Sequence, residues 1–130
     1  AARGLTGTPK NQFEEGLRNL IGLIQSNGAM VIVCTPSVIG EKNNGSNKYD
    51  LMLDEYSTLS RKVTLESGSI LCDLRTIFMK HLALHNLPNA EKDILTYDGV
   101  HLNDAGNRMV AHALMNVFIE KNVLTPSSKN

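Results

Sequence analysis

Apolar residues recur near the start of the chain at the spacing of an amphipathic helix. They fall three or four positions apart, at Phe13, Leu17, Leu20, Ile21 and Ile24. Thr8 and Pro9 ahead of this run are typical of a helix cap and of a first helical position. Asn27 and Gly28 behind it are typical of a helix end, because glycine adopts the left-handed conformation of a C-cap. The pattern predicts a helix over residues 9–27.

Two continuous apolar runs are of a different kind. They read AMVIVCT at residues 29–35 and SILCD at residues 69–73. Short runs of this type are typical of parallel strands that are buried on both faces. One cysteine lies in each run, and two cysteines do not make a disulfide framework. We expect both Cys34 and Cys72 to be small buried hydrophobic residues.

Helical spacing returns in three further segments. It predicts a helix that ends at Gly68, a helix that begins at Leu74, and a last helix over residues 104–121 that Asn103 caps. The apolar residues that carry these patterns are Tyr49, Met52, Leu53, Tyr56, Leu59 and Val63; Leu74, Ile77, Phe78 and Leu82; and Val110, Ala113, Leu114, Val117 and Phe118. We expect these side chains to face inward.

The alternation of helix and strand predicts an α/β layered fold. A strand, a helix and a second strand in that order form a right-handed crossover between parallel strands. Functional residues of such folds gather in loops past the carboxyl ends of the strands. The expected loops at residues 36–47 and 86–102 both fit that rule. We expect the tail, residues 125–130, to fray.

Composition and charge exclude several classes of protein. The length of 130 residues suits one domain, and 42% hydrophobic residues are enough for a core. Thirteen basic and thirteen acidic residues leave no net charge, so the sequence indicates no nucleic-acid partner. No apolar run reaches the length of a membrane span. We expect no cofactor.

The stretch TYDGVHL, residues 96–102, places a carboxylate three residues ahead of an imidazole. Histidine is the usual general base near neutral pH, and a carboxylate on its second ring nitrogen fixes the tautomer. A tight turn would bring Asp98 and His101 together, with Val100 and Leu102 as anchors. The spacing alone also fits a solvated Asp–Gly turn with an incidental histidine, or half of a metal site that has no further ligand at convincing spacing.

The other histidines are predicted to lie at surface positions of helices. His81 and His85 are one helical turn apart, which also suits two zinc ligands, but no companion ligand accompanies them. We therefore expect both on the surface of a helix. His112 is expected on the polar side of the last helix.

The loop after the first strand holds the candidate substrate-binding residues, Ser37, Val38 and Ile39. Ser37 lies on the expected catalytic edge, but no helix starts directly after it, as a nucleophile elbow requires. Val38, Ile39 and Glu41 are candidates to border a substrate pocket. Alternatively, Val38 and Ile39 only pin the loop to the core.

Residues 95–114, LTYDGVHLNDAGNRMVAHAL, resemble the last signature block of the SGNH hydrolases, also called the GDSL esterase and lipase family, with the form D-G-x-H-L-N-x-x-G. Upstream, GTPKNQFEEGLRNLI is similar to the helix after the family's G-x-N-D block. VIVCTPSVIGE and CDLRTIF are similar to the segments that follow. The resemblance implies a three-layer α/β/α fold of the flavodoxin type. It also implies hydrolysis of a small ester by a serine–histidine–aspartate triad, with His101 as base and Asp98 as its carboxylate.

The sequence departs from that family at the nucleophile. The family's G-D-S block and its Gly and Asn oxyanion donors are not found in this sequence. We therefore expect residues 1–130 to form the C-terminal part of one such domain, inactive by itself. The alternative is a catalytically inactive α/β module with a binding or structural role.

The expected strand count bears on assembly. Two strands are expected here, against about five in the family, and a two-stranded sheet is marginal alone. Its open edge invites another chain to pair with it. We expect a missing N-terminal segment or a second copy of the chain to cover this edge, with a compact monomer as the alternative.

Overall fold

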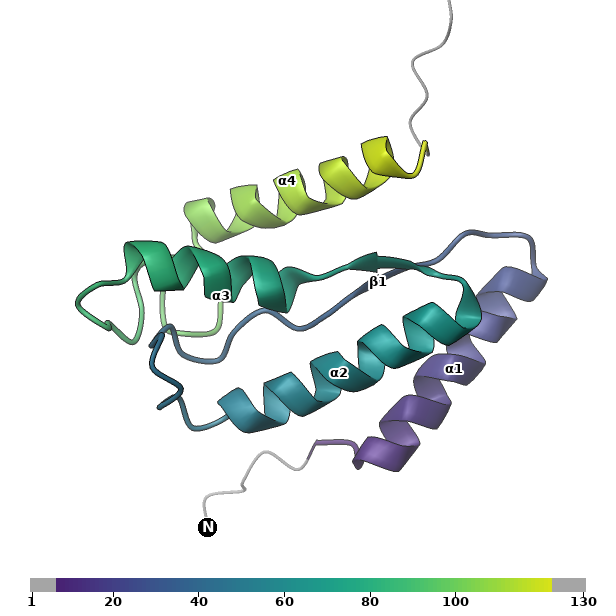
Figure 1. Ribbon diagram of the computed structural model, residues 1–130, viewed down its shortest axis with the longest axis horizontal. Helices are drawn as coiled ribbons and strands as arrows, with labels where there is room; N and C mark the ends of the chain where they lie inside the picture. Colours follow the sequence, from purple (N-terminus) through teal and green to yellow (C-terminus); the bar gives the residue numbers. More distant parts are fainter. Residues whose placement is uncertain (1–6, 123–130) are drawn as a thin grey trace, which may run out of the picture.

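The computed structural model describes residues 7–122, so the predicted frayed tail lies outside the described residues. Its elements are α1 (Lys10–Ser26), β1 (Ile32–Cys34), α2 (Asp50–Ser67), β2 (Ile70–Cys72), α3 (Leu74–His85) and α4 (Asp104–Glu120). Figure 1 shows α4 on one side of the strands and α1 and α2 on the other. The chain therefore has the layered α/β fold that its sequence predicts.

The two strands run parallel and in register. Ile32 pairs with Ile70, and Cys34 pairs with Cys72. Both strands are shorter than the apolar runs that predicted them, because a strand extends only as far as its partner. Backbone hydrogen bonds continue the ladder at both ends, from Ile70 N to Val31 O (2.9 Å) and from Thr35 N to Cys72 O (3.1 Å).

The helix ends show which of the predicted capping residues are found in the structure. Gly68 ends α2 in the left-handed conformation, with φ of 68°. Asn103 caps α4 by accepting a hydrogen bond from the backbone N–H of Gly106 (3.0 Å). The expected cap at Thr8 is wrong, because Pro9 is the residue that precedes α1 and no side chain caps it. Within residues 7–122 no helix is both long and apolar enough to cross a membrane.

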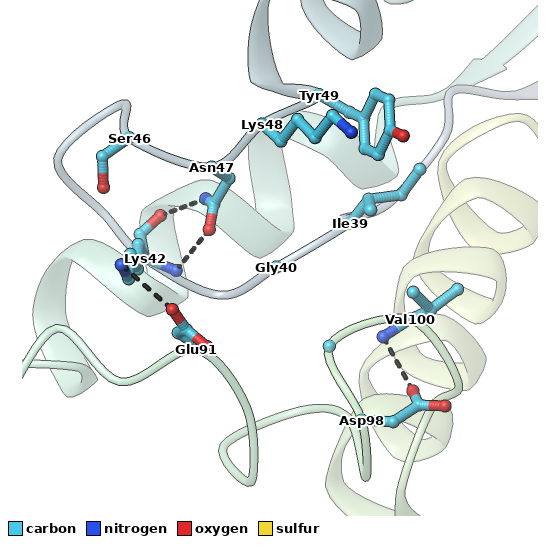
Figure 2. A pocket seen from close by; sticks show the side chains of 11 residues that line it. Ile39, Gly40, Lys42, Ser46, Asn47, Lys48, Tyr49, Glu91, Asp98 and Val100 are labelled. Carbon is cyan, nitrogen blue, oxygen red and sulfur yellow. Dashed lines mark hydrogen bonds and ion pairs between the residues drawn. The ribbon is translucent and has the colours of Figure 1, made fainter. Parts of the chain in front are cut away.

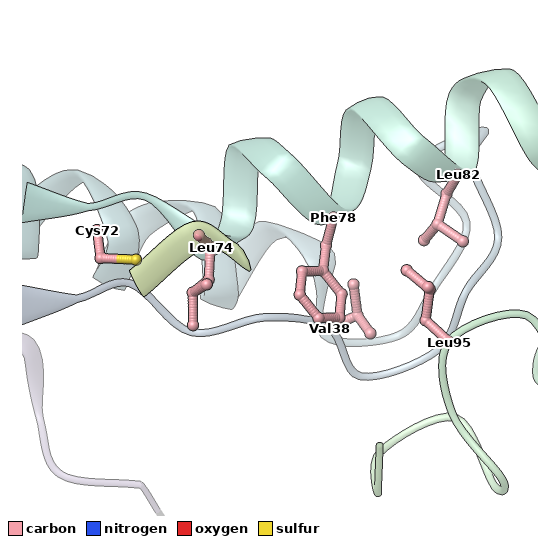
Figure 3. Packing of buried hydrophobic residues seen from close by; sticks show 7 residues of the cluster. Val38, Cys72, Leu74, Phe78, Leu82 and Leu95 are labelled. Atoms are coloured by element: carbon pink, nitrogen blue, oxygen red, sulfur yellow. The ribbon is translucent and has the colours of Figure 1, made fainter. Parts of the chain in front are cut away.

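The core has two clusters, one on each side of the sheet. Val38, Cys72, Leu74, Phe78, Leu82, Leu95 and Ala113 form the larger cluster (Figure 3). Ile21, Val33 and Val63 form the smaller one, under α1 and α2. Val38 and Leu95 come from the two predicted loops rather than from helices or strands. Both loops are therefore anchored in the core, and Val38 pins its loop, one of the two roles expected for it.

The two cysteines differ in burial, although the sequence predicted the same environment for both. Cys72 is buried, and Cys34 is exposed. The prediction for Cys34 is wrong because α4 packs chiefly against β2 and leaves the end of β1 open. Burial, and then the neighbouring Cys34, raises the pKa of the Cys72 thiol to about 11. Both cysteines are free thiols.

Candidate active site

Asp98 and His101 lie together in the turn at residues 96–102. Oδ2 of Asp98 is 2.6 Å from Nδ1 of His101, so the predicted contact is confirmed. Oδ1 of Asp98 accepts the backbone N–H groups of Val100 (2.9 Å) and His101 (2.8 Å). Figure 2 shows the Asp98–Val100 bond at the edge of a pocket. Backbone donors thus hold the carboxylate while its second oxygen faces the imidazole.

These hydrogen bonds determine where the protons lie. The backbone N–H of His101, followed by its imidazole and the N–H of Val100, holds the pKa of Asp98 well below its usual range. Asp98 is therefore ionised near neutral pH, and an ionised carboxylate only accepts hydrogen bonds. Nδ1 of His101 must then carry the shared proton, which leaves Nε2 as the basic nitrogen. The His101 side chain is 80% exposed, so Nε2 is accessible to a reacting group.

A short antiparallel bridge between Thr96 and Leu102 closes the turn. Gly99 sits at its tip with φ of 93°, a conformation that favours glycine, and donates its N–H to Oγ1 of Thr96 (2.8 Å). Leu102 packs against the core, as expected. Val100 is 47% exposed and does not anchor the turn, because it lies at the tip, beyond the elements that form the core.

The first turn of α4 packs against the segment that leads into the dyad turn. The backbone N–H of Asn103 donates to the carbonyl of Leu95 (3.0 Å), just ahead of the dyad. A Cβ atom on Gly106 would overlap that same carbonyl oxygen. The glycine is thus needed where the helix meets the dyad loop. The D-G-x-H-L-N-x-x-G pattern therefore describes one packed unit of turn, cap and helix.

Glu41 has a different role from the expected one. Its side chain is fully buried and does not border the pocket. Its carboxylate accepts the backbone N–H groups of Ile94 (3.0 Å) and Leu95. These amides lie in irregular structure, and a buried N–H needs an acceptor from elsewhere in the fold. Glu41 supplies both acceptors and so holds the segment that leads into the dyad.

Two further contacts tie the loop after β1 to the dyad loop. The buried Asn86 donates its side-chain amide to the carbonyls of Glu41 (2.7 Å) and Ala90 (2.9 Å). The backbone N–H of Gly40 donates to the carbonyl of Gly99 (2.7 Å), directly beside the dyad. Residues 36–47 and 86–102 therefore behave as one joined structure.

A buried arginine fixes the start of the loop that follows β1. Arg75, on α3, pairs with Asp50 (3.1 Å) and Asp54 (2.8 Å) and donates to the carbonyl of Ser37 (3.0 Å). Among residues 7–122 the structure gives Ser37 no hydrogen bond to the dyad. The arginine therefore orders the loop through its backbone.

Asp73 adds a second polar anchor at the same point. It caps α3 and accepts a hydrogen bond from Thr35 (2.9 Å), the residue after β1. Burial alone would raise its pKa, but hydrogen bonds from Arg61, Thr35 and Thr76 lower the pKa of Asp73 to about 2. Asp73 is thus ionised and bridges the ends of the two strands.

A pocket of about 350 Å³ lies between the loop after β1 and the dyad turn. Ile39 and Tyr49 lie on one side of it, and Asp98 and Val100 on the other (Figure 2). Ile39 lines this pocket. Ser37 and Val38 do not line it, because Val38 turns into the core.

The remaining histidines lie apart from this pocket. His81 and His85 are neighbours on α3, with ring centroids 4.4 Å apart. Burial, and then the charge of His85, lowers the pKa of His81. His112 is exposed on α4, as expected. In the part of the chain that the structure describes, no group of three or more His, Cys, Asp or Glu residues could hold a metal ion.

Comparison with solved structures identifies the kind of enzyme that shares this fold. The acetyl xylan esterase AlAXEase is 38% identical with a TM-score of 0.85, and the match covers 88% of this chain and 58% of that chain. LAE5, an α/β hydrolase from the metagenome of Lake Arreo, Spain, is 24% identical with a TM-score of 0.74, covering 89% and 50%. A variant of Axe2, an acetyl xylan esterase from Geobacillus stearothermophilus, is 22% identical with a TM-score of 0.70, covering 84% and 47%.

A scan against protein-family models and a search of the curated proteins gave no match. The chain spans 58% of the length of AlAXEase and about half of the other two. The two matches below 25% identity show similarity in fold alone, whereas the match to AlAXEase also shows similarity in sequence. The chain therefore has an α/β fold similar to part of the AlAXEase and Axe2 structures, which agrees with the SGNH-type resemblance of its sequence.

Proposed function

We propose that this chain supplies the general base and the orienting carboxylate of a carboxylic-ester hydrolase. The observation that carries the proposal is the 2.6 Å contact from Asp98 to Nδ1 of an otherwise exposed His101. In this mechanism Nε2 of His101 takes the proton of a serine hydroxyl as that serine attacks the ester carbonyl. The same nitrogen then returns the proton to the departing alcohol. Asp98 stabilises the imidazolium that forms between these two steps.

The nucleophile and the oxyanion donors are proposed to come from outside the 130 residues, because the sequence contains no G-D-S block. Ser37 is a poor substitute, since it does not line the pocket beside the dyad. Loss of the covalent step and of oxyanion stabilisation removes most of the rate enhancement in such enzymes. The chain by itself should therefore be inactive.

The proposed substrate is a small acetyl ester of a carbohydrate. AlAXEase and Axe2 are both acetyl xylan esterases, and AlAXEase shares 38% identity with this chain.

The catalytic unit is also proposed to cover the open edge of the sheet. In the described residues β1 pairs only with β2, and an apolar pocket of about 370 Å³ opens near Cys34 and Met52. A further strand from an N-terminal segment, or a second copy of the chain, would pair with β1. Light scattering, with mass spectrometry to exclude a co-purified fragment, tests this. A stable monomer with cooperative unfolding would contradict it.

A chimera tests the catalytic proposal. This chain replaces the matching 58% of AlAXEase, and deacetylation of an acetylated xylo-oligosaccharide is measured. We expect His101→Ala and Asp98→Asn each to lower kcat by at least about a thousandfold. The matched control is His112→Ala, at an exposed histidine of α4, which should leave kcat unchanged. An active chimera that keeps its kcat after His101→Ala would refute the proposal.

A further inference from the structure

We infer that Asn44 is a site of spontaneous deamidation, promoted by the turn in which it lies. An asparagine followed by glycine is especially reactive, because glycine has no side chain to keep its backbone nitrogen away from the asparagine side chain. The sequence contains two such pairs, Asn27–Gly28 and Asn44–Gly45. Their surroundings in the fold differ, and these surroundings make the second pair the reactive one.

The reaction uses groups of the chain itself and water. A base from the solvent removes the proton of the Gly45 backbone N–H, and the nitrogen then attacks Cγ of Asn44. The bond from Cγ to Nδ2 breaks, and Nδ2 leaves as ammonia with a proton from the solvent, so that a succinimide ring remains. Water opens this ring at either carbonyl and gives aspartate or isoaspartate at position 44. Nothing is oxidised or reduced, and the chain gains a carboxylate.

Ser46 prepares the Asn44 side chain for this attack. Oδ1 of Asn44 accepts the backbone N–H of Ser46 (3.1 Å) and its hydroxyl group (2.6 Å). A hydrogen bond from the residue two positions on folds the Asn44 side chain over the intervening peptide, which brings Cγ toward the Gly45 nitrogen. The same two donors stabilise the negative charge that develops on Oδ1 during the attack, as the donors of an oxyanion hole do.

The attacking nitrogen is accessible. Gly45 is exposed, and within residues 7–122 the structure gives its N–H no hydrogen-bond acceptor. No atom lies within 4 Å of the position that a Cβ atom would take on Gly45. Figure 2 shows Ser46 on the outer bend of this loop. Solvent therefore reaches the proton that must be removed.

The pair Asn27–Gly28 is held in an unreactive form at the end of α1. The backbone N–H of Gly28 donates to the carbonyl of Gln25 (2.9 Å). Nδ2 of Asn27 donates to the carbonyl of Leu23 (2.8 Å). The attacking nitrogen and the leaving group are thus both engaged, and both hydrogen bonds must break before a ring can close. The same dipeptide is therefore slow at position 27 and fast at position 44.

The two products affect the loop differently. Aspartate at position 44 keeps an acceptor for both donors of Ser46, so the turn is retained. Isoaspartate inserts Cβ into the main chain and takes this acceptor away from Ser46, which lines the pocket beside the dyad turn. Accumulation of isoaspartate should therefore shift the backbone amide NMR signals of residues 44–47, whereas Asn44→Asp should leave most of them in place.

The test is incubation of the 130-residue chain near neutral pH, followed by peptide mapping with mass spectrometry, which locates each replacement of NH₂ by OH. We expect Asn44 to react at least about tenfold faster than Asn27, because two hydrogen bonds restrain Asn27–Gly28. Ser46→Ala should slow the reaction at Asn44 about three- to tenfold, the effect of one lost hydrogen bond. Ser46→Thr keeps the hydroxyl group and should stay within about twofold of the unmodified chain.

Denaturation separates the effect of the fold from that of the sequence. In guanidinium chloride both pairs lose these hydrogen bonds, so their rates should come within about threefold of each other. Equal rates in the folded chain, a faster reaction at Asn27, or an unchanged rate in Ser46→Ala would overturn the inference. A preference for Asn44 that persists at full size in the denatured chain would assign it to the sequence alone and would also overturn the inference.

Discussion

Replacement of Glu41 by glutamine should destabilise the chain more than any exposed charge neutralisation. The side chain is fully buried, and its two oxygens accept the N–H groups of Ile94 and Leu95. Glutamine keeps one acceptor and turns an NH₂ group toward the other N–H. One hydrogen bond to a charged group is lost, and two donors then face each other without a partner.

The expected loss is about 2–4 kcal/mol of unfolding free energy, because a hydrogen bond to a charged group is lost and buried donors are left unsatisfied. For a chain of this size that loss corresponds to a fall in Tm of roughly 8–15 °C. The matched control is Glu91→Gln, in the same pair of loops. Glu91 is mostly exposed and pairs with Lys42, so its replacement should cost about 0–1 kcal/mol.

The assay combines thermal unfolding with amide hydrogen exchange. In Glu41→Gln, exchange should speed up first at Leu95 and Gly99, because the clamp that leads into the dyad turn is loosened. Equal Tm values for Glu41→Gln and Glu91→Gln would refute the reasoning. So would faster exchange spread evenly over α1 and α2.

Three further predictions concern the dyad loop. Gly106→Ala should lower the free energy of unfolding, measured with denaturant, by about 1–3 kcal/mol, because the new Cβ overlaps the Leu95 carbonyl. Gly22→Ala, on the open face of α1, should instead raise that free energy by up to about 1 kcal/mol. Equal effects of the two substitutions would contradict this. Since the pKa of Asp98 is lowered in the folded chain, its hydrogen bonds stabilise the fold above the unfolded pKa, and this stabilisation is lost as the pH falls through the folded pKa. In an NMR titration His101→Ala should raise the pKa of Asp98 but leave it below the ordinary value, because backbone donors remain; an unchanged pKa would count against the dyad. Hydrolysis of p-nitrophenyl acetate by the chain should be no faster than by His101→Ala, and a faster rate that Ser37→Ala abolishes would identify Ser37 as the nucleophile.

Local signals predicted the elements of the fold better than their extents. Gly68 and Asn103 end and begin helices because each acts on its own neighbours in sequence. The limits of β1 depend on β2, which lies far away along the chain, so the apolar run overestimates the strand. The burial of Cys34 likewise depends on where α4 packs, which periodicity does not reveal.

The dyad was predictable because its contact is local. Asp98 and His101 are three residues apart, and a turn suffices to join them. The supports of the dyad are not local. Glu41 reaches amides more than fifty positions away, and Arg75 is buried only because acidic residues of α2 meet it. One sequence signal was nevertheless present, since an aspartate directly ahead of an apolar helix is typical of the cap that Asp73 forms.

The tautomer of His101 tests the central claim most directly. At neutral pH, two-bond proton–nitrogen NMR correlations show which ring nitrogen carries the proton. The dyad predicts a protonated Nδ1 and a bare Nε2, because the ionised Asp98 can only accept the hydrogen bond at Nδ1. In Asp98→Asn this preference should disappear. A protonated Nε2 in the unmodified chain, or a spectrum unaffected by Asp98→Asn, would contradict the role of His101 as an oriented base.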